Sequence, residues 1–306
     1  MREVIERLTV PAIAAPMFLV SGPELVQATC QAGVIGAFPF PNARTIDTLD
    51  EWLGRLSHAL SRQPNAAPFA ANLTTHRSYD RLEAEIDLIK RHQPPIVITA
   101  LGSPEPVIDT VHSYGGTVIA DVNSVALARK AVAKGADGLA LVSAGAGGHT
   151  GFLTGFSFVG EVRRFFDGLV VLAGGIGTGQ AIRAAQALGA DLCYMGTRFI
   201  VAQESLASDE YRDMVVAATA EDLVLSDKLT GAPAYYLRAS LEKMGMDPNN
   251  PGQRSGMDLS DSQGQIKAWK HVWSAGHGVG SIHRRQSAAE IVTELRQQYD
   301  EARAVP

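Results

Sequence analysis

Short apolar runs alternate with stretches of helical periodicity over about the first two thirds of the chain. Eight of these runs lack the in-and-out alternation of half-exposed antiparallel strands. They are Ala12 to Pro16, Gly33 to Ala37, Phe69 to Asn72, Ile96 to Thr99, Thr117 to Ala120, Gly138 to Val142, Leu169 to Ala173 and Leu192 to Met195. Eight parallel strands joined by crossover helices predict an α/β protein with a closed (β/α)8 TIM barrel.

The connections between the runs carry helical signals. Predicted helices cover Pro23 to Ala32, Tyr79 to Arg91, Ser124 to Lys134 and Thr178 to Leu188. Gly135 and Gly189 fall where a helix needs a left-handed residue at its end. The turns KGADGLAL and LGADLCYM repeat one device, in which Gly closes a helix and an Ala-Asp pair leads into the next strand. This likeness supports repeated βα units.

The pattern changes after Met195. Ser208 to about Met244 is predicted to be helix-rich, and no second sheet is expected from Val201 onwards. The Pro, Gly, Asn and Ser content of DPNNPGQRSGMDLSDSQGQ predicts an exposed loop, and Ile266 to Tyr299 regains helical character. We therefore assign 1–200 and 266–306 to the barrel, and 201–265 to a helical and loop insertion after strand eight, either a lid or a small domain.

Composition narrows the partners. The chain has 306 residues, a net charge of -5 and a pI near 5.9, so it lacks the basic surface that nucleic acids or anionic membranes require. No uninterrupted apolar stretch reaches the roughly 18 residues of a membrane span, and we expect a cytoplasmic protein. Cys30 and Cys193 lie in apolar patterns typical of buried reduced thiols. The scattered histidines show no metal-ligand spacing, so no metal is expected.

Two glycine-rich turns follow the last two predicted strands. Strand seven ends in AGGIGTG and opens a helix, and strand eight ends in YMGTRF. Glycines around Gly174 to Gly177 and at Gly196, with Thr197, let backbone N–H groups approach a phosphate. The loops after the last two strands of such barrels commonly hold a phosphate. We therefore interpret this pair of turns as a binding site for a phosphorylated ligand, and not merely as tight corners of the backbone.

A run of small residues, SAGAGGHTG, follows strand six. Glycines and alanines remove steric bulk where a flat ring must approach the backbone. His149 in the middle of the run has an ordinary pKa near 6.5, which suits proton transfer at neutral pH. The alternative is a structural role, with His149 capping the next helix.

Three further residues at strand ends are candidates for ligand contacts. Met17 can lie against a ring or fill the core. The Asn72 amide can both donate and accept, as a contact to a flavin pyrimidine edge or to a substrate oxyanion requires, or it can cap a loop. Ser124 is assigned to capping a helix, whereas the role of Asp121 stays open. A carboxylate facing a flavin would disfavour its anionic reduced form.

Taken in order, APM, AGGHTG, AGGIGTG, MGTRF, AQESLASDEYR and TGAPA resemble the nitronate monooxygenase family, over nearly the whole chain. The resemblance implies FMN in a TIM barrel and His149 as the residue that takes the α-proton or positions a nitronate. The implied cofactor-binding residues are Ala15, Pro16, Met17, Asn72, Asp121, Ser143, Ala146, Gly147, Gly148, Ala173, Gly174, Gly175, Gly177, Met195, Gly196 and Thr197.

The chain departs from the family at several of these positions. Many relatives carry a lysine where Asp121 stands, and a glutamine-glycine pair where Val142 and Ser143 stand. WSAGHGVGSI has His277 in place of a glutamine, and TGAPAYYLR has Ala234 and Tyr235 where an arginine and a small residue are common. Tyr235, Tyr236 and His277 are therefore candidates for the substrate pocket.

The main functional hypothesis is oxidation of alkyl nitronates with oxygen to carbonyl compounds and nitrite. The alternative is an FMN reductase that NAD(P)H reduces and that acts on quinones or on enoyl and enone substrates. A third option is an FMN-binding protein without catalysis. The partner is expected to be a small molecule. The residues leave open the physiological substrate, the electron donor and the oligomeric state, with a homodimer among the options.

Overall fold

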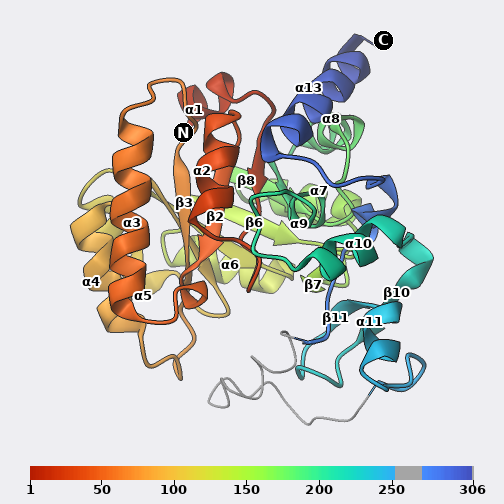
Figure 1. Cartoon of the computed structure of the whole chain (residues 1–306). Coiled ribbons are helices and arrows are strands. Elements are labelled where there is room, and N and C mark those ends of the chain that lie inside the picture. Colours follow the sequence, from red (N-terminus) through yellow and green to blue (C-terminus); the bar gives the residue numbers. More distant parts are fainter. Residues whose placement is uncertain (252–270, 305–306) are drawn as a thin grey trace.

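The computed structural model of the chain describes residues 1–251 and 271–304. Eight parallel strands close into a barrel in chain order (Figure 1). They are β1 (Ala12–Ala14), β2 (Ile35–Pro39), β3 (Phe69–Thr74), β4 (Ile96–Ala100), β5 (Thr117–Val122), β6 (Gly138–Val142), β8 (Leu169–Ala173) and β9 (Leu192–Met195). All eight predicted strands are confirmed, with ends that differ by no more than two residues.

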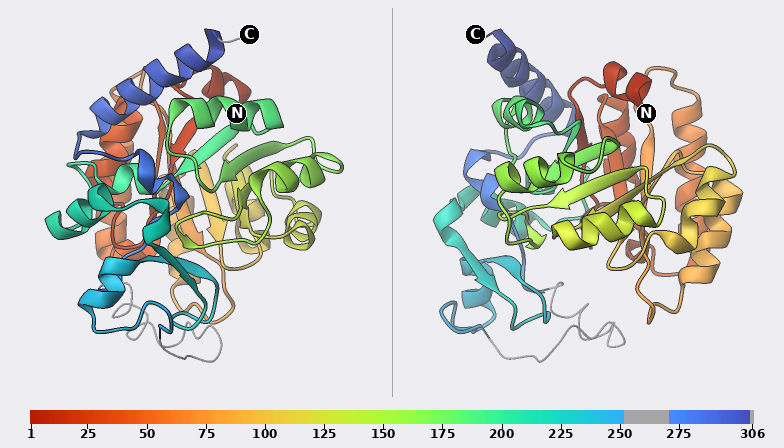
Figure 2. Two further views of the ribbon diagram at one scale, coloured as in Figure 1. Left: turned by 90° about the vertical axis from the view of Figure 1, so that its right-hand side faces the viewer. Right: turned by 180° about the vertical axis from the view of Figure 1, so that it is seen from behind.

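Helices surround the barrel and cover the outer face of its strands (Figures 1 and 2). They are α2 (Pro23–Gln31), α3 (Ile46–Ser61), α4 (Leu82–His92), α5 (Glu105–His112), α6 (Val125–Ala133), α7 (Gly155–Arg163), α8 (Gly179–Leu188) and α13 (Ala288–Ala304). Four of these, α2, α4, α6 and α8, were predicted from the sequence. Ser124 caps α6 as predicted, because its hydroxyl accepts from Leu127 N.

Each strand is buried on both faces, which explains the continuous apolar runs. Inward-facing side chains such as Ile13, Ile98 and Val171 fill the barrel, whereas outward-facing side chains pack against the helices. Helix α1 (Arg2–Arg7) packs Val4 and Ile5 against the barrel core. Helix α13 contacts α8 and α2 and so completes the ring of helices.

The repeated Gly-Ala-Asp turns lie at the amino ends of the strands. Gly135 and Gly189 have the predicted left-handed conformation, with φ of +89° and +108°. Each following aspartate accepts a backbone hydrogen bond at 2.8 Å, Asp137 from Val118 N and Asp191 from Val170 N. The device therefore ties the start of one strand to the start of its neighbour.

The insertion after β9 contains a second sheet, so the expectation of none was wrong. After α9 (Thr197–Ile200) and α10 (Asp209–Ala217), strands β10 (Leu223–Ser226) and β11 (Ala234–Leu237) precede α11 (Arg238–Lys243). Strand β11 pairs on one side with β10 and on the other with β7 (Gly148–His149), from the loop after β6. Figures 1 and 2 show β10, β11 and α11 together at the end of the barrel away from α1.

The apolar alternation in LVLS and AYYL was too short to be recognised as strands, and pairing with β7 depends on a residue about 80 positions away. The small sheet has its own core, which includes Val224, Ala234 and Leu241. The predicted loop lies largely in 252–270, outside the described residues. No helix in residues 1–251 or 271–304 is long and apolar enough to cross a membrane.

Candidate active site

Four inward-facing residues form the last layer of the barrel at the carboxyl ends of the strands. They are Ala15, Asn72, Asp121 and Ala173, on or directly after β1, β3, β5 and β8, and the strand registers place them in one layer from alternate strands. We call this layer the floor. Its two alanines leave room for a flat ring, while Asn72 Nδ2 donates to Ile98 O at 3.3 Å. The structure thus brings together four of the residues predicted to contact a cofactor.

Asp121 and Tyr194 form an unusual polar pair at the floor. Tyr194 is only 7% exposed, and neither its hydroxyl nor the buried Asp121 Oδ1 has a hydrogen-bond partner of normal geometry among the described residues. Burial raises the pKa of Asp121 to about 7, an effect that the nearby Tyr194 hydroxyl opposes. Burial and the Asp121 carboxylate raise the pKa of Tyr194 well above its ordinary value. Asp121 and Tyr194 therefore influence each other's ionisation within the floor.

The two predicted phosphate turns lie side by side, because Ala173 pairs with Tyr194 at the ends of β8 and β9. Gly174 has φ of +119°, and a Cβ there would lie 2.3 Å from Ser143 Oγ. Gly175 is exposed, and the nearest atom to a Cβ there would be His277 Cβ at 3.8 Å. Glycine is thus required at Gly174, while Gly175 leaves the backbone open to a ligand.

Gly177, Gly196 and Thr197 complete these turns. A Cβ at Gly177 would lie 2.3 Å from Ser281 Oγ, so this glycine serves close packing. Gly196 lies next to Met17, whose Sδ would be 3.4 Å from a Cβ there. Thr197 Oγ1 accepts from Gly276 N at 2.8 Å and so ties the turn to the segment that carries His277.

The loop after β6 is held from both sides. Ser143 is 1% exposed and donates its hydroxyl to Ala173 O at 2.5 Å, so its side chain joins β6 to β8 and is turned away from a ligand. A Cβ at Gly147 would lie 2.7 Å from Gly276 N, which shows how closely the two backbones pass. Ala146, at 8% exposure, and half-buried Gly148 follow the same path. The glycines here admit a neighbouring backbone as well as a ligand.

His149 lies on β7, at the junction of the barrel and the small sheet. It pairs with Ala234 of β11, and its Nε2 lies 3.3 Å from Thr230 Oγ1. Thr230 in turn donates to Ala232 O at 3.1 Å. Burial lowers the pKa of His149, so the ring is neutral at physiological pH and can accept a proton. Thr154 caps α7, so the alternative capping role for His149 was wrong.

The three candidate pocket residues occupy different environments. His277 donates its backbone N–H to Gly145 O at 2.9 Å and places its ring over that glycine. Tyr235 meets the His277 ring edge-on, with centroids 4.7 Å apart. Tyr236 is 1% exposed within the core of the small sheet, so its predicted place in the pocket was wrong. Side chains alternate along β11, and only one of two adjacent tyrosines can face the barrel.

The sequence analysis did not predict that Asn42 holds the loop after β1 in place. Asn42, which is 8% exposed, donates to Met17 O and Ser21 O and accepts from Leu19 N, with all three distances between 2.7 and 2.9 Å. Leu19 has φ of +63°, a strained conformation that this contact supports. Pro16 and Met17 stay half-buried near the mouth. An asparagine after a Phe-Pro pair gives no sequence signal for such a role.

Met195 turns its side chain away from the barrel interior. Its side chain is 0% exposed and belongs to the outer core cluster between strands and helices. Only its backbone lies near the mouth, where its carbonyl accepts from Ala15 N at 3.1 Å. The side chain therefore cannot contact a cofactor. The strand alternation that turns Tyr194 inward turns Met195 outward.

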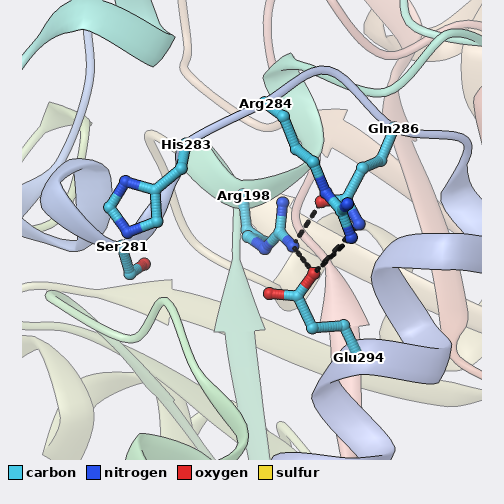
Figure 3. Close-up of a pocket in the computed structure, with 6 residues that line it drawn as sticks. All are labelled: Arg198, Ser281, His283, Arg284, Gln286 and Glu294. Carbon is cyan, nitrogen blue, oxygen red and sulfur yellow. Dashed lines mark hydrogen bonds and ion pairs between the residues drawn. The ribbon is translucent and has the colours of Figure 1, made fainter.

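A polar cavity of about 270 Å³ lies beside α9 and α13, and its lining contains none of the predicted site residues. Figure 3 shows Arg198 as its centre, with Nη2 2.7 Å from Gln286 Oε1 and 3.2 Å from Glu294 Oε2. Arg198 is 2% exposed and directly follows the Gly196–Thr197 turn. We infer that these polar contacts hold the Gly196–Thr197 turn in place against α13.

The site as a whole suits a flat ring with a phosphate. The floor has alanines beneath a ring and unsatisfied polar atoms at Asp121 and Tyr194, and the paired turns lie at its side. His149 approaches from the small sheet. No group of three or more metal-ligating side chains occurs within residues 1–251 and 271–304.

Comparisons with known proteins indicate the family to which the chain belongs. The family model for nitronate monooxygenase matches residues 59–298. A putative monooxygenase of Mycobacterium tuberculosis is 32% identical over 231 residues, 70% of this chain and 61% of the relative. A Rhodococcus jostii protein named (3aS,4S,5R,7aS)-5-hydroxy-7a-methyl-1-oxo-octahydro-1H-indene-4-carboxyl-CoA dehydrogenase is 30% identical over 233 residues, 76% of this chain and 63% of the relative.

Among solved structures, FabK of Thermotoga maritima is 25% identical, with a TM-score of 0.80 over 98% of this chain and 95% of that chain. The matched region spans less than two thirds of the length of each of the two curated relatives.

Proposed function

Because the chain belongs to the nitronate monooxygenase family, a family of flavin-dependent oxidoreductases, we propose that it binds FMN and oxidises alkyl nitronates with oxygen to carbonyl compounds and nitrite. The observation that carries this proposal is the position of His149. It lies on β7, in the glycine-rich loop that follows the barrel strand β6, and β7 pairs with β11 of the small sheet. A neutral imidazole in this place can take the α-proton of a nitroalkane, or it can position a nitronate that has already lost that proton.

The residues around the mouth fit FMN. The phosphate would be held by the turns at Gly174, Gly175, Gly196 and Thr197, where glycine leaves the backbone open. The ring would lie near Met17, above the floor. FMN, when bound, supplies the redox chemistry, and the protein supplies orientation and proton transfer.

Tyr235 and His277 would bound the substrate on the side of the insertion. Their edge-on contact places two rings between the small sheet and the segment that crosses the loop after β6. Two rings at this point limit the bulk of a substrate that reaches His149. We therefore propose that the described part of the insertion, residues 201–251, bounds the site through Thr230 and Tyr235.

A second candidate is an FMN reductase that uses NAD(P)H and acts on quinones or on enoyl and enone substrates. The name of the Rhodococcus jostii relative favours it, since that protein is a dehydrogenase of a carboxyl-CoA compound. Both candidates use the same FMN site and differ in what reduces the flavin.

Anaerobic stopped-flow mixing of the FMN-loaded protein separates the two. We expect propyl-2-nitronate alone to change the flavin absorbance, and His149→Asn to slow this step. His58→Asn, on the exposed face of α3, is the matched control and should behave as the wild type. Reduction by NADH or NADPH with nitronate inert would overturn the monooxygenase and establish the reductase.

A further inference from the structure

The Asp121 carboxyl is isolated from cations inside the barrel. Its inward-facing neighbours on β4 and β6 are apolar: Ile98, Ala100, Ala140 and Val142. Tyr194 on β9 is the titratable group that influences its ionisation, together with burial itself. Among the described residues, no arginine, lysine or histidine contributes to that influence. An ionised carboxylate that is buried in a barrel core without a cation lowers the stability of the fold, so its presence suggests a functional role.

The Asp121 carboxyl also lies close to the mouth of the barrel. Among the described residues, Asp121 Oδ1 is buried without a hydrogen-bond partner of normal geometry, whereas the residue as a whole keeps partial exposure at the carboxyl end of β5. The titratable groups around that space are His149 on β7, Tyr235 on β11 and His277. A ligand ring placed over the floor would thus lie next to Asp121.

We propose that Asp121 and Tyr194 form a proton-linked site in the floor, which takes up one proton from solvent when a ligand in the mouth gains negative charge. The proposal rests on the proposed function, because it takes the ligand to be FMN. A carboxylate and an anionic ring repel each other strongly in a medium of low polarity, so protonation of the carboxylate accompanies the new charge.

If FMN is bound, reduction by an added reductant such as dithionite would bring two electrons from the reductant and one proton from solvent to the ring, and would leave it with one negative charge. A second proton from solvent binds Asp121 and converts its carboxylate to the neutral acid. Because burial already places the Asp121 pKa near neutrality, this second uptake requires little free energy.

The first experiment uses the protein without flavin. Infrared difference spectra between wild type and Asp121→Asn, recorded from pH 5 to 9, should show one carboxyl that titrates near neutral pH. Asp109→Asn, an exposed carboxylate on α5, is the control and should not remove this signal. An Asp121 carboxyl that remains ionised at pH 5 would overturn the proposal.

The second experiment measures the midpoint potential of bound FMN against pH. Above pH 7 the wild type should take up two protons per two electrons, and Asp121→Asn only one. The pH range in which reduction takes up two protons should extend to higher pH in Tyr194→Phe, since the Tyr194 hydroxyl lowers the pKa of Asp121. Equal proton uptake in wild type and Asp121→Asn would overturn the proposal. If FMN does not bind while the carboxyl titrates near neutrality, the proton site is supported and the proposed cofactor fails.

Discussion

The two ends of the barrel use aspartate in opposite ways. At the amino ends of the strands, Asp137 accepts from Val118 N and pairs with His112, and Asp191 accepts from Val170 N and pairs with Arg163. At the carboxyl ends, no cation among the described residues affects the ionisation of Asp121, and one of its oxygens is buried without a hydrogen bond of normal geometry. A satisfied carboxylate stabilises the fold, whereas an unsatisfied one marks the end that receives a ligand.

The largest effect should come from the catalytic end. His149→Asn keeps the size and polarity of the side chain and removes the base, so kcat/KM for a neutral nitroalkane should fall roughly 10²- to 10⁴-fold. The preformed nitronate has already lost its α-proton and should lose much less. Steady-state oxygen consumption with both substrates checks this. An equal loss for both substrates would show that His149 positions the substrate and does not remove its proton.

At the opposite end, the loss should appear in stability. Asp191→Ala leaves the Val170 N–H without its acceptor and Arg163 without its carboxylate, which should reduce the free energy of unfolding by about 2 kcal/mol. Urea denaturation measures this, and FMN affinity should be unchanged. A large loss of FMN affinity at unchanged stability would contradict the division between the two ends.

The contribution of Asp121 to the free energy of unfolding should decrease as the pH rises. Its pKa in the folded protein, about 7, lies above the ordinary value of 3.8, so the folded state binds more protons between these values. The stability of wild type relative to Asp121→Asn should therefore fall as pH rises from 4 to 7, by up to about 1.4 kcal/mol per pH unit, and then level off. Urea denaturation of the flavin-free proteins at pH 5, 6, 7 and 8 tests this sign. A difference that grows in favour of wild type with pH would refute the raised pKa.

The barrel could be predicted because its signals are local. Each strand is a short apolar run, and Gly135 and Gly189 mark helix ends by their own chemistry. Four floor residues were predicted, in part because they follow or end such runs. The face of the strand on which each side chain lies was harder to predict. Met195 and Tyr236 directly follow Tyr194 and Tyr235, and adjacent side chains of a strand point to opposite faces.

Contacts across long sequence distances could not be predicted. Asn42 acts on Met17 and Leu19, and Arg198 acts on Gln286 and Glu294, and none of these pairs has a local pattern. Thr230 belongs to a recognised motif, TGAPA, yet its contact with His149 exists only because β11 pairs with β7. A single sequence contains no information on such pairings beyond the strands themselves.

Thr230 gives the smallest predicted effect and the finest test of the catalytic end. Thr230→Val keeps the shape of the side chain and removes the hydroxyl beside His149 Nε2, so kcat/KM for a neutral nitroalkane should fall about tenfold, or about 1.4 kcal/mol. Thr230→Ser should restore most of it. In the His149→Asn background, Thr230→Val should have almost no further effect, because residues that act through one another are not additive. A tenfold loss that persists in that background would mean that Thr230 supports the small sheet and does not orient His149.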